Sequence, residues 1–317
     1  MGMSDNLPAA LARWSPWHKS SKGLVGVEIG SEGLAFAHTN VEGGATKLSL
    51  CEFLLNQDGH VPEEQFRHRI EELGLTGCAC NVVLPPHEYN LLLVEAPNVP
   101  AEEMREAVRW RIKDLVTTPL DQTLIDIFHL PKDSSRSGTP MLYVVTTPSE
   151  TVMETIRLIE DANLTLQYID VTELALRNLA ESVADDQRGL ALVKLQQGRG
   201  SLSLLRHGSL YLSRQFELPY NGGLLDDLPE DQLVLELQRS LDYYERQMGQ
   251  APPSAIYLCG ENITADKITD SIRNSLTANV DVLDMSSSLS FNGDVDDALL
   301  QLCATAIGGA LRRPEVA

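Results

Sequence analysis

The chain has 317 residues, 43% of them hydrophobic, which is enough apolar material for two domains of ordinary size. A formal net charge of −20 argues against a nucleic-acid-binding protein, because phosphate recognition needs a basic stripe. No apolar run approaches the roughly 18 residues of a membrane-spanning helix. The amino terminus also lacks the charged, apolar and small-residue segments that follow one another in a secretory signal.

Residues 1–22 are predicted to form a flexible arm. Trp14 and Trp17 lie on either side of Pro16, which prevents one continuous amphipathic helix. The tryptophans either pack onto the nearest domain or dock on a membrane surface or a partner. We expect the arm to be dispensable for folding.

A β-rich stretch that begins at Gly23 occurs again 166 residues later, beginning at Gly189. Each copy has a short run of Val, Ile and Leu, a turn that contains glycine, and a second run. A third run follows over 47–54 in the first copy and over 210–218 in the second. Short apolar runs joined by glycine turns predict β-hairpins rather than helices.

The other predicted elements follow from apolar periodicity and helix-start signals such as Pro with acidic residues. Helices are predicted over 62–73, 100–116, 148–163, 170–183, 230–248, 265–276 and 296–311. Strands are predicted over 81–84, 89–95, 122–129, 142–146, 165–169, 254–259 and 280–283. This order predicts an α/β first domain over 23–87 and 168–188, an inserted α+β module over 88–167, and a second domain over 189–317.

Residues that often carry chemistry are scattered along the chain. The five cysteines, at 51, 78, 80, 259 and 303, form no Cys-x-x-Cys pair, so we expect small buried hydrophobic side chains in a reducing compartment. The seven histidines lack the paired spacing of a metal-binding helix. No P-loop and no Gly-x-Ser-x-Gly elbow is present.

Five segments resemble, in the right order, the PilM family of type IV pilus assembly proteins, and most closely its MSHA-pilus branch. They are Gly26-Val27-Glu28-Ile29-Gly30-Ser31, the stretch from Glu103 to Asp121, Tyr168 to Leu176, Glu236 to Tyr244, and Ala306 to Arg312. The similarity covers roughly residues 23–313. The resemblance implies a duplicated actin-like, ribonuclease H-like α/β fold, with a nucleotide cleft between the halves. It also implies that the insert is the α+β subdomain shared with the division protein FtsA.

The resemblance further implies a cytoplasmic protein that associates peripherally with the inner membrane. Its partner would be a bitopic PilN-like membrane protein, by analogy MshJ, whose cytoplasmic tail lies in a groove beside the insert. Arg109, Trp110 and Arg111 are candidate contacts, since Trp and Arg are enriched among interface hot spots. A core position for Trp110 is an equal alternative.

A member of this fold could bind ATP and Mg²⁺ in its cleft. The residues that match nucleotide-binding positions are Gly30, Ser31, Glu32, Gly33, Glu236, Arg239, Ser240 and Gly260, although the three helical ones could equally be a solvated helix face.

The chain departs from the family pattern around this cleft. Lys194 and Gln196 replace an acid and a glycine, and only Pro219 to Asp231 stands where the family has a fourth subdomain. That subdomain is therefore predicted to be severely shortened. We expect a scaffold without ATP hydrolysis; the alternatives are an ATPase or kinase whose nucleotide state controls partner binding, and an FtsA-like filament former.

Glu28 and Lys194 occupy equivalent positions in the two copies and have opposite charges. They are predicted to face each other across the cleft and could hold the two halves together without nucleotide. Alternatively, Lys194 reaches solvent and the two never meet. A partly shielded pair of this kind would contribute about 1 kcal/mol.

Overall fold

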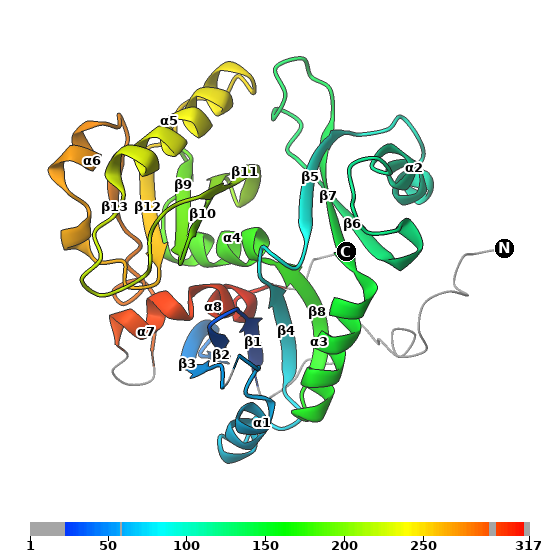
Figure 1. Cartoon of the computed structure of the whole chain (residues 1–317), viewed down its shortest axis with the longest axis vertical. Helices are drawn as coiled ribbons and strands as arrows, with labels where there is room; N and C mark the ends of the chain where they lie inside the picture. Colours follow the sequence, from blue (N-terminus) through cyan, green and yellow to red (C-terminus); the bar gives the residue numbers. More distant parts are fainter. Residues whose placement is uncertain (1–22, 58, 292–295, 314–317) are drawn as a thin grey trace.

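The computed structural model describes residues 23–57, 59–291 and 296–313, so the Trp14–Trp17 arm lies outside the described residues. Two five-stranded sheets and one three-stranded sheet form the framework of this part of the chain (Figure 1).

The first sheet has the strand order β3-β2-β1-β4-β8. Its strands are β1 (Leu24–Ile29), β2 (Gly33–Glu42), β3 (Ala45–Leu55), β4 (Ala79–Leu84) and β8 (Thr165–Val171), with α1 (Glu63–Glu72) between β3 and β4. The first three strands form an antiparallel meander, and β4 and β8 continue the sheet in parallel with β1.

The second sheet repeats this plan with the order β11-β10-β9-β12-β13. Its strands are β9 (Leu190–Gln196), β10 (Arg199–Arg206), β11 (Ser209–Glu217), β12 (Ala255–Gly260) and β13 (Asn279–Val282), and α5 (Glu230–Arg246) precedes β12. Glu28 pairs with Ala35 and Lys194 pairs with Ser201, so the two hairpins have the same register. The predicted duplication is confirmed.

The insert has its own antiparallel sheet, in the order β5-β7-β6. Its elements are β5 (Asn90–Glu95), α2 (Met104–Arg111), β6 (Thr123–His129), β7 (Met141–Pro148) and α3 (Ser149–Asp161), with short 3₁₀ turns at Ala101–Glu103 and Leu120–Gln122. One face of the sheet packs on α2 through Val108 and Ile112. The other faces the second domain, where the backbone N–H of Ser213 donates to the Tyr143 hydroxyl at 2.8 Å.

The end of the insert merges with the first domain. Leu158 and Ile159 of α3 belong to the same apolar cluster as Val27 and Phe66. The predicted boundary at residue 167 lies inside β8, whose first residues already pair with β4. Consequently α3 forms a wall of the first domain as well as part of the insert.

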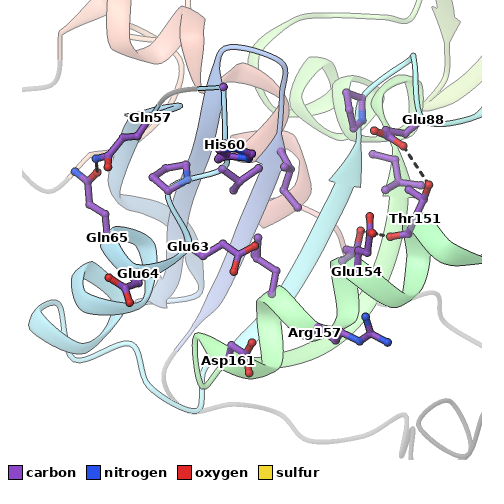
Figure 2. A pocket seen from close by; sticks show the side chains of 18 residues that line it. Gln57, His60, Glu63, Glu64, Gln65, Glu88, Thr151, Glu154, Arg157 and Asp161 are labelled. Atoms are coloured by element: carbon purple, nitrogen blue, oxygen red, sulfur yellow. Dashed lines mark hydrogen bonds between the residues drawn. The ribbon is translucent and has the colours of Figure 1, made fainter.

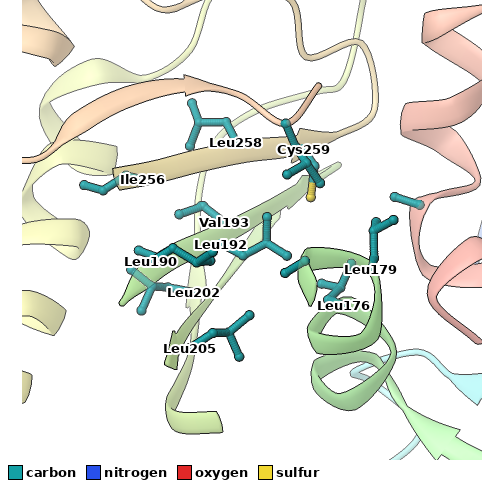
Figure 3. Close-up of a cluster of buried hydrophobic side chains, with 14 of the residues drawn as sticks. Leu176, Leu179, Leu190, Leu192, Val193, Leu202, Leu205, Ile256, Leu258 and Cys259 are labelled. Atoms are coloured by element: carbon teal, nitrogen blue, oxygen red, sulfur yellow. The ribbon is translucent and has the colours of Figure 1, made fainter. Parts of the chain in front are cut away.

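Two helices cross between the halves. Leu176 and Leu179 of α4 (Thr172–Val183) pack against the second sheet (Figure 3). In return α8 (Ala304–Ala310), near the end of the chain, lies on the first sheet and against α4. A Cβ atom on Gly26 would come within 2.0 Å of the Ala306 carbonyl oxygen, and one on Gly308 within 2.1 Å of the Ala175 carbonyl oxygen. Glycine is required at both positions because the backbones are in direct contact.

Side chains of the first domain bind the last carbonyl groups of α8. Thr39 donates to Ala310 at 2.8 Å, Asn81 to Gly309 at 3.0 Å and Asn178 to Gly308 at 3.3 Å. These bonds satisfy acceptors that a helix end leaves without intrahelical partners. They fix α8 where it can present Thr305 to the cleft.

Three predicted helices are shorter than expected. The 100–116 helix ends at Arg111, because the Arg109 guanidinium binds the Leu120 carbonyl and the chain turns back. The 265–276 helix is a turn over Ala265–Lys267 followed by α6 (Asp270–Asn274), which starts anew because Thr269 caps its N-terminus. The 296–311 helix divides at Cys303 into α7 (Asp297–Leu302) and α8.

Candidate functional site

The interdomain cleft contains a buried ion pair. Lys194 Nζ lies 2.6 Å from Glu28 Oε1 and 2.5 Å from Thr305 Oγ1, so β9 of the second domain is tied to β1 and α8. The Lys194 and Glu28 side chains are only 4% and 7% exposed. The contact expected across the cleft is therefore present.

The partial shielding expected for this pair is wrong. Both groups are buried, and α8 contributes the Thr305 hydroxyl that accepts from Lys194. Removing one partner of a buried pair typically costs about 3–5 kcal/mol, since the other charge is left unpaired in a low dielectric. The value of about 1 kcal/mol for an exposed pair does not apply.

The second hairpin turn is bonded to the protein itself. The Gly198 N–H donates to the Tyr220 carbonyl at 2.8 Å, and the Gly198 carbonyl accepts from the Leu218 N–H at 3.0 Å. In an actin-like ATPase, backbone N–H groups of this turn would face a phosphate. Here the chain after β11 folds back and occupies that donor.

The connection between β11 and α5 has neither helix nor strand, as the predicted shortening requires. The Tyr220 hydroxyl donates to the Glu261 carbonyl at 2.8 Å, and Lys267 Nζ donates to the Gly223 carbonyl at 2.7 Å. Asn262 also binds the Gly222 carbonyl. This short connection is thus packed on the loop after β12.

The end of β12 is also occupied. The Gly260 N–H donates to Gln301 Oε1 at 3.2 Å, and Gln301 is itself held by donating to the Leu283 carbonyl at 2.9 Å. Gly260 has φ +121°, and a Cβ atom there would lie 2.0 Å from the Leu195 carbonyl oxygen. The single glycine is therefore explained by strand packing.

The first hairpin turn keeps the expected shape. The Gly30 N–H closes it onto the Gly33 carbonyl at 2.8 Å, and Asn56 donates to the Ser31 carbonyl at 2.7 Å. Glu32 is exposed at its tip. Across the cleft, burial raises the pKa of Glu261, and the Glu32 charge raises it further. Two acids whose charges act on each other in this way disfavour a phosphate between them.

The three expected base contacts on α5 interact mainly with one another. Glu236 pairs with Arg239 at 2.7 Å and lies 3.7 Å from Arg214 of β11. Ser240 is fully buried and donates to the Glu236 carbonyl at 2.7 Å. These contacts give each residue a structural role.

Taken together, the cleft residues do not fit Mg²⁺–ATP as this fold ordinarily holds it. The Glu28 carboxylate is already paired with Lys194, and the Gly198 and Gly260 N–H groups already have acceptors. Within the described residues, no group of three or more His, Cys, Asp or Glu side chains is arranged to hold a metal ion.

A groove of about 890 Å³ lies outside this cleft, between the first domain and α3. One wall is the loop before α1 together with the first two residues of α1, Glu63 and Glu64, and the other is α3 with Glu154, Arg157 and Asp161 (Figure 2). Its lining also includes the apolar residues Ile29, Val61, Pro62, Leu84 and Leu158.

The acidic side chains of the groove are largely unengaged. Glu63, Glu64, Glu154 and Asp161 form no ion pair with any described residue. Glu88 accepts from the Thr151 hydroxyl at 3.2 Å. Apolar lining residues beside unpaired carboxylates suit an extended segment that carries basic residues. The resemblance implied a groove beside the insert, but sequence reasoning missed the residues that line this one, because an acidic helix face normally indicates only contact with solvent.

The candidate contacts on α2 do not line this groove. Trp110 is 67% exposed, so the core alternative for it is wrong. The Lys113 ammonium lies 6.0 Å from the Trp110 ring centre, and Arg111 pairs with Glu95 at 3.2 Å. Figure 1 shows α2 on the outer side of the insert, away from α1.

All five cysteines are free and buried, as expected. In the described part of the chain, no helix is both long and apolar enough to span a bilayer.

No protein-family model matches the sequence, and no curated protein matches it closely enough to count as a relative. Solved structures do match. A chain of the PilM–PilN type IV pilus biogenesis complex is 19% identical, with a TM-score of 0.69 over 92% of this chain and 98% of that one. A Bacteroides thetaiotaomicron protein with an actin-like ATPase fold is 10% identical, with a TM-score of 0.51 over 86% and 94%.

The cytoplasmic domain of EpsL, an inner-membrane component of the Vibrio cholerae type II secretion system, is 8% identical, with a TM-score of 0.50 over 92% and 95%. At these identities the likeness establishes the fold. The predicted duplicated actin-like α/β fold is confirmed.

Proposed function

We propose that this protein is an actin-like scaffold of type IV pilus biogenesis that docks the cytoplasmic tail of a bitopic PilN-like inner-membrane protein. Within that class we assign it to the MSHA-pilus branch as an MshI-like protein, with an MshJ-like partner. It would lie in the cytoplasm and reach the inner membrane through that partner. The fold likeness to a chain of the PilM–PilN complex supports this class.

The observation that carries the proposal is the acidic groove between the first domain and α3. Cytoplasmic segments next to a membrane span carry an excess of Lys and Arg. Such a tail would place basic side chains against Glu154 and Asp161 and apolar side chains against the apolar lining near Leu84. The groove thus takes the role that sequence reasoning gave to Arg109, Trp110 and Arg111.

The cleft supports a scaffold rather than a nucleotide-driven machine. The Glu28–Lys194 pair joins the two halves directly, and the neighbouring N–H donors are satisfied within the chain. We therefore propose that the protein stays closed without ATP and does not hydrolyse it. A thermal-shift measurement with Mg²⁺–ATP tests this, because ligand at 100 times its Kd stabilises a protein by about 2.7 kcal/mol. We expect no shift and no phosphate release; steady release that is lost on Gly30→Val would overturn this part.

Docking is tested by measuring the binding of a fluorescent peptide to the full chain. The peptide has the sequence of the partner's cytoplasmic tail. We expect saturable binding that weakens as salt is raised. Glu154→Lys should weaken it at least tenfold, whereas Glu102→Lys, an exposed acid outside the groove, should leave it unchanged. Equal effects of the two variants, or no binding by the unaltered protein, would refute the proposal.

A further inference from the structure

The short connection before α5 presents two exposed leucines. Leu224 is 74% exposed and Leu225 is 96% exposed, and Asp226 and Asp227 follow directly. We call these four residues the leucine knob. Large apolar side chains this exposed are usual singly, but an adjacent pair on an acidic turn is an unusual surface for a monomer.

The backbone beneath the knob is held firmly. The Gly223 N–H donates to Asp226 Oδ2 at 3.0 Å, and the Gly223 carbonyl accepts from Lys267 Nζ at 2.7 Å. Gly222 has φ +76° and binds Asn262 through its carbonyl. An anchored turn loses little conformational entropy when it binds, so the knob is preorganised for docking.

A second cavity, of about 450 Å³, offers the complementary surface. It lies where the start of β5 meets β10 and β11, and we call it the junction pocket. Pro86, Leu91 and Leu92 supply apolar lining, and Arg199 stands at the start of β10. Arg199 is exposed and makes no side-chain hydrogen bond or ion pair with the residues described, in a chain with a net charge of −20.

The knob and the pocket are complementary in polarity and in charge. The knob has two apolar side chains beside two carboxylates, and the mixed lining of the pocket has an apolar part, Pro86, Leu91 and Leu92, beside an unpaired guanidinium. Arg199 can pair with Asp226 or Asp227 while the leucines enter the cavity, which is within the size range of ordinary ligand sites. The groove next to α3 is a poor alternative because its acids would repel the knob.

We infer that the leucine knob of one copy docks in the junction pocket of a second copy of this chain. Within one copy the knob is held on the loop after β12 and remains solvent-exposed, so it does not fill its own pocket. The contact joins two different surfaces, which makes it heterologous, and its repetition gives rings or helical filaments.

Sedimentation velocity of the full chain over a wide concentration range tests this association. The unaltered protein should form species larger than a monomer, and added salt should dissociate them. Leu225→Ser and Arg199→Glu should each weaken association at least tenfold. Both positions are exposed, so folding should be retained. Val41→Ser, which alters a valine that is 71% exposed, is the matched control and should have no effect.

Mixing the two impaired variants gives the sharpest outcome. The Arg199→Glu chain retains an intact knob and the Leu225→Ser chain retains an intact pocket, so an equimolar mixture should form dimers and nothing larger. A monomeric unaltered protein, an equal loss with Val41→Ser, or a mixture that stays monomeric would overturn the inference. No tail peptide is present in this assay, so its failure would leave the proposed docking function untouched.

Discussion

The cleft and the acidic groove border the same first domain. The polar groups of the cleft are paired within the chain, whereas most acids of the groove lack a cationic partner in the described part of the chain. In the cleft, the Glu28 carboxylate is paired with Lys194, and the Gly198 and Gly260 N–H groups have acceptors in the chain. In the groove, Glu154 and Asp161 have no ion-pair partner among the described residues. A site whose polar groups are satisfied internally contributes stability, whereas one with unsatisfied charges at the surface is available to bind a partner.

The largest expected effect is a loss of stability when the ion pair in the cleft is broken. Lys194→Ala leaves the buried Glu28 carboxylate without its cation, so the free energy of unfolding should fall by about 3–5 kcal/mol. Urea denaturation at neutral pH measures this. The double variant Glu28→Gln with Lys194→Met removes both charges and should recover most of the loss.

The closure of the two halves is a second property that can be measured in the Lys194→Ala variant. If the ion pair holds the cleft shut, Lys194→Ala should increase the radius of gyration in small-angle scattering. An unchanged radius together with a loss below about 1 kcal/mol would contradict the assignment of a buried interdomain pair.

The next effect is on binding rather than on stability. Charge reversal of Asp161, as Asp161→Lys, should weaken binding of the partner's tail peptide about tenfold, which corresponds to about 1.4 kcal/mol. Its unfolding free energy should change by less than about 0.5 kcal/mol, because the side chain is exposed and unpaired. Fluorescence anisotropy and urea unfolding on the same sample measure both. A large loss of stability would show that the groove acids are structural.

Only part of this difference between the cleft and the groove could be predicted from the sequence. The repeat places Glu28 and Lys194 at equivalent positions, so their meeting could be predicted from spacing and charge. Their full burial could not, because it depends on α8 returning to the first sheet and presenting Thr305. That return rests on close backbone contacts at Gly26 and Gly308, which no local pattern indicates.

The residues that line the groove could not be predicted for a different reason. Glu154 and Asp161 have the spacing of a solvated face of α3, and they become one wall of the groove only because tertiary packing places the start of α1 opposite them. Composition favoured Trp110 instead, since exposed Trp and Arg mark interfaces. Position in the fold, rather than residue type, distinguishes the two candidates.

Trp110→Ala therefore tests whether residue type or position in the fold identifies the partner-binding site. The side chain is 67% exposed and contacts Lys113, so its removal should change unfolding free energy by less than about 0.5 kcal/mol. Because α2 does not line the groove, affinity for the tail peptide should stay within about twofold, or about 0.4 kcal/mol. A tenfold loss would place the binding site on α2 rather than in the groove.

The smallest effect concerns the mouth of the cleft, where Glu32 and Glu261 face each other. Burial raises the pKa of Glu261 above its ordinary value of 4.5, the Glu32 charge raises it further, and Lys267 opposes the shift. A carboxyl whose pKa is higher in the folded state than in the unfolded state binds its proton more tightly when folded. Its contribution to stability is thus complete below pH 4.5 and is lost as the pH rises through the folded pKa.

Glu261→Gln should consequently stabilise the protein at pH 7.5, where the native carboxylate is charged, and have little effect near pH 4.5. The group is only partly buried, so the gain should be a few tenths of a kcal/mol, about the scale of exposed charge interactions. Thermal denaturation at the two pH values measures it. Glu32→Gln should lower the pKa of Glu261 in an NMR titration and reduce the gain from Glu261→Gln. If Glu261→Gln instead destabilises at pH 7.5, the carboxylate has a favourable partner and the two acids do not repel each other across the cleft.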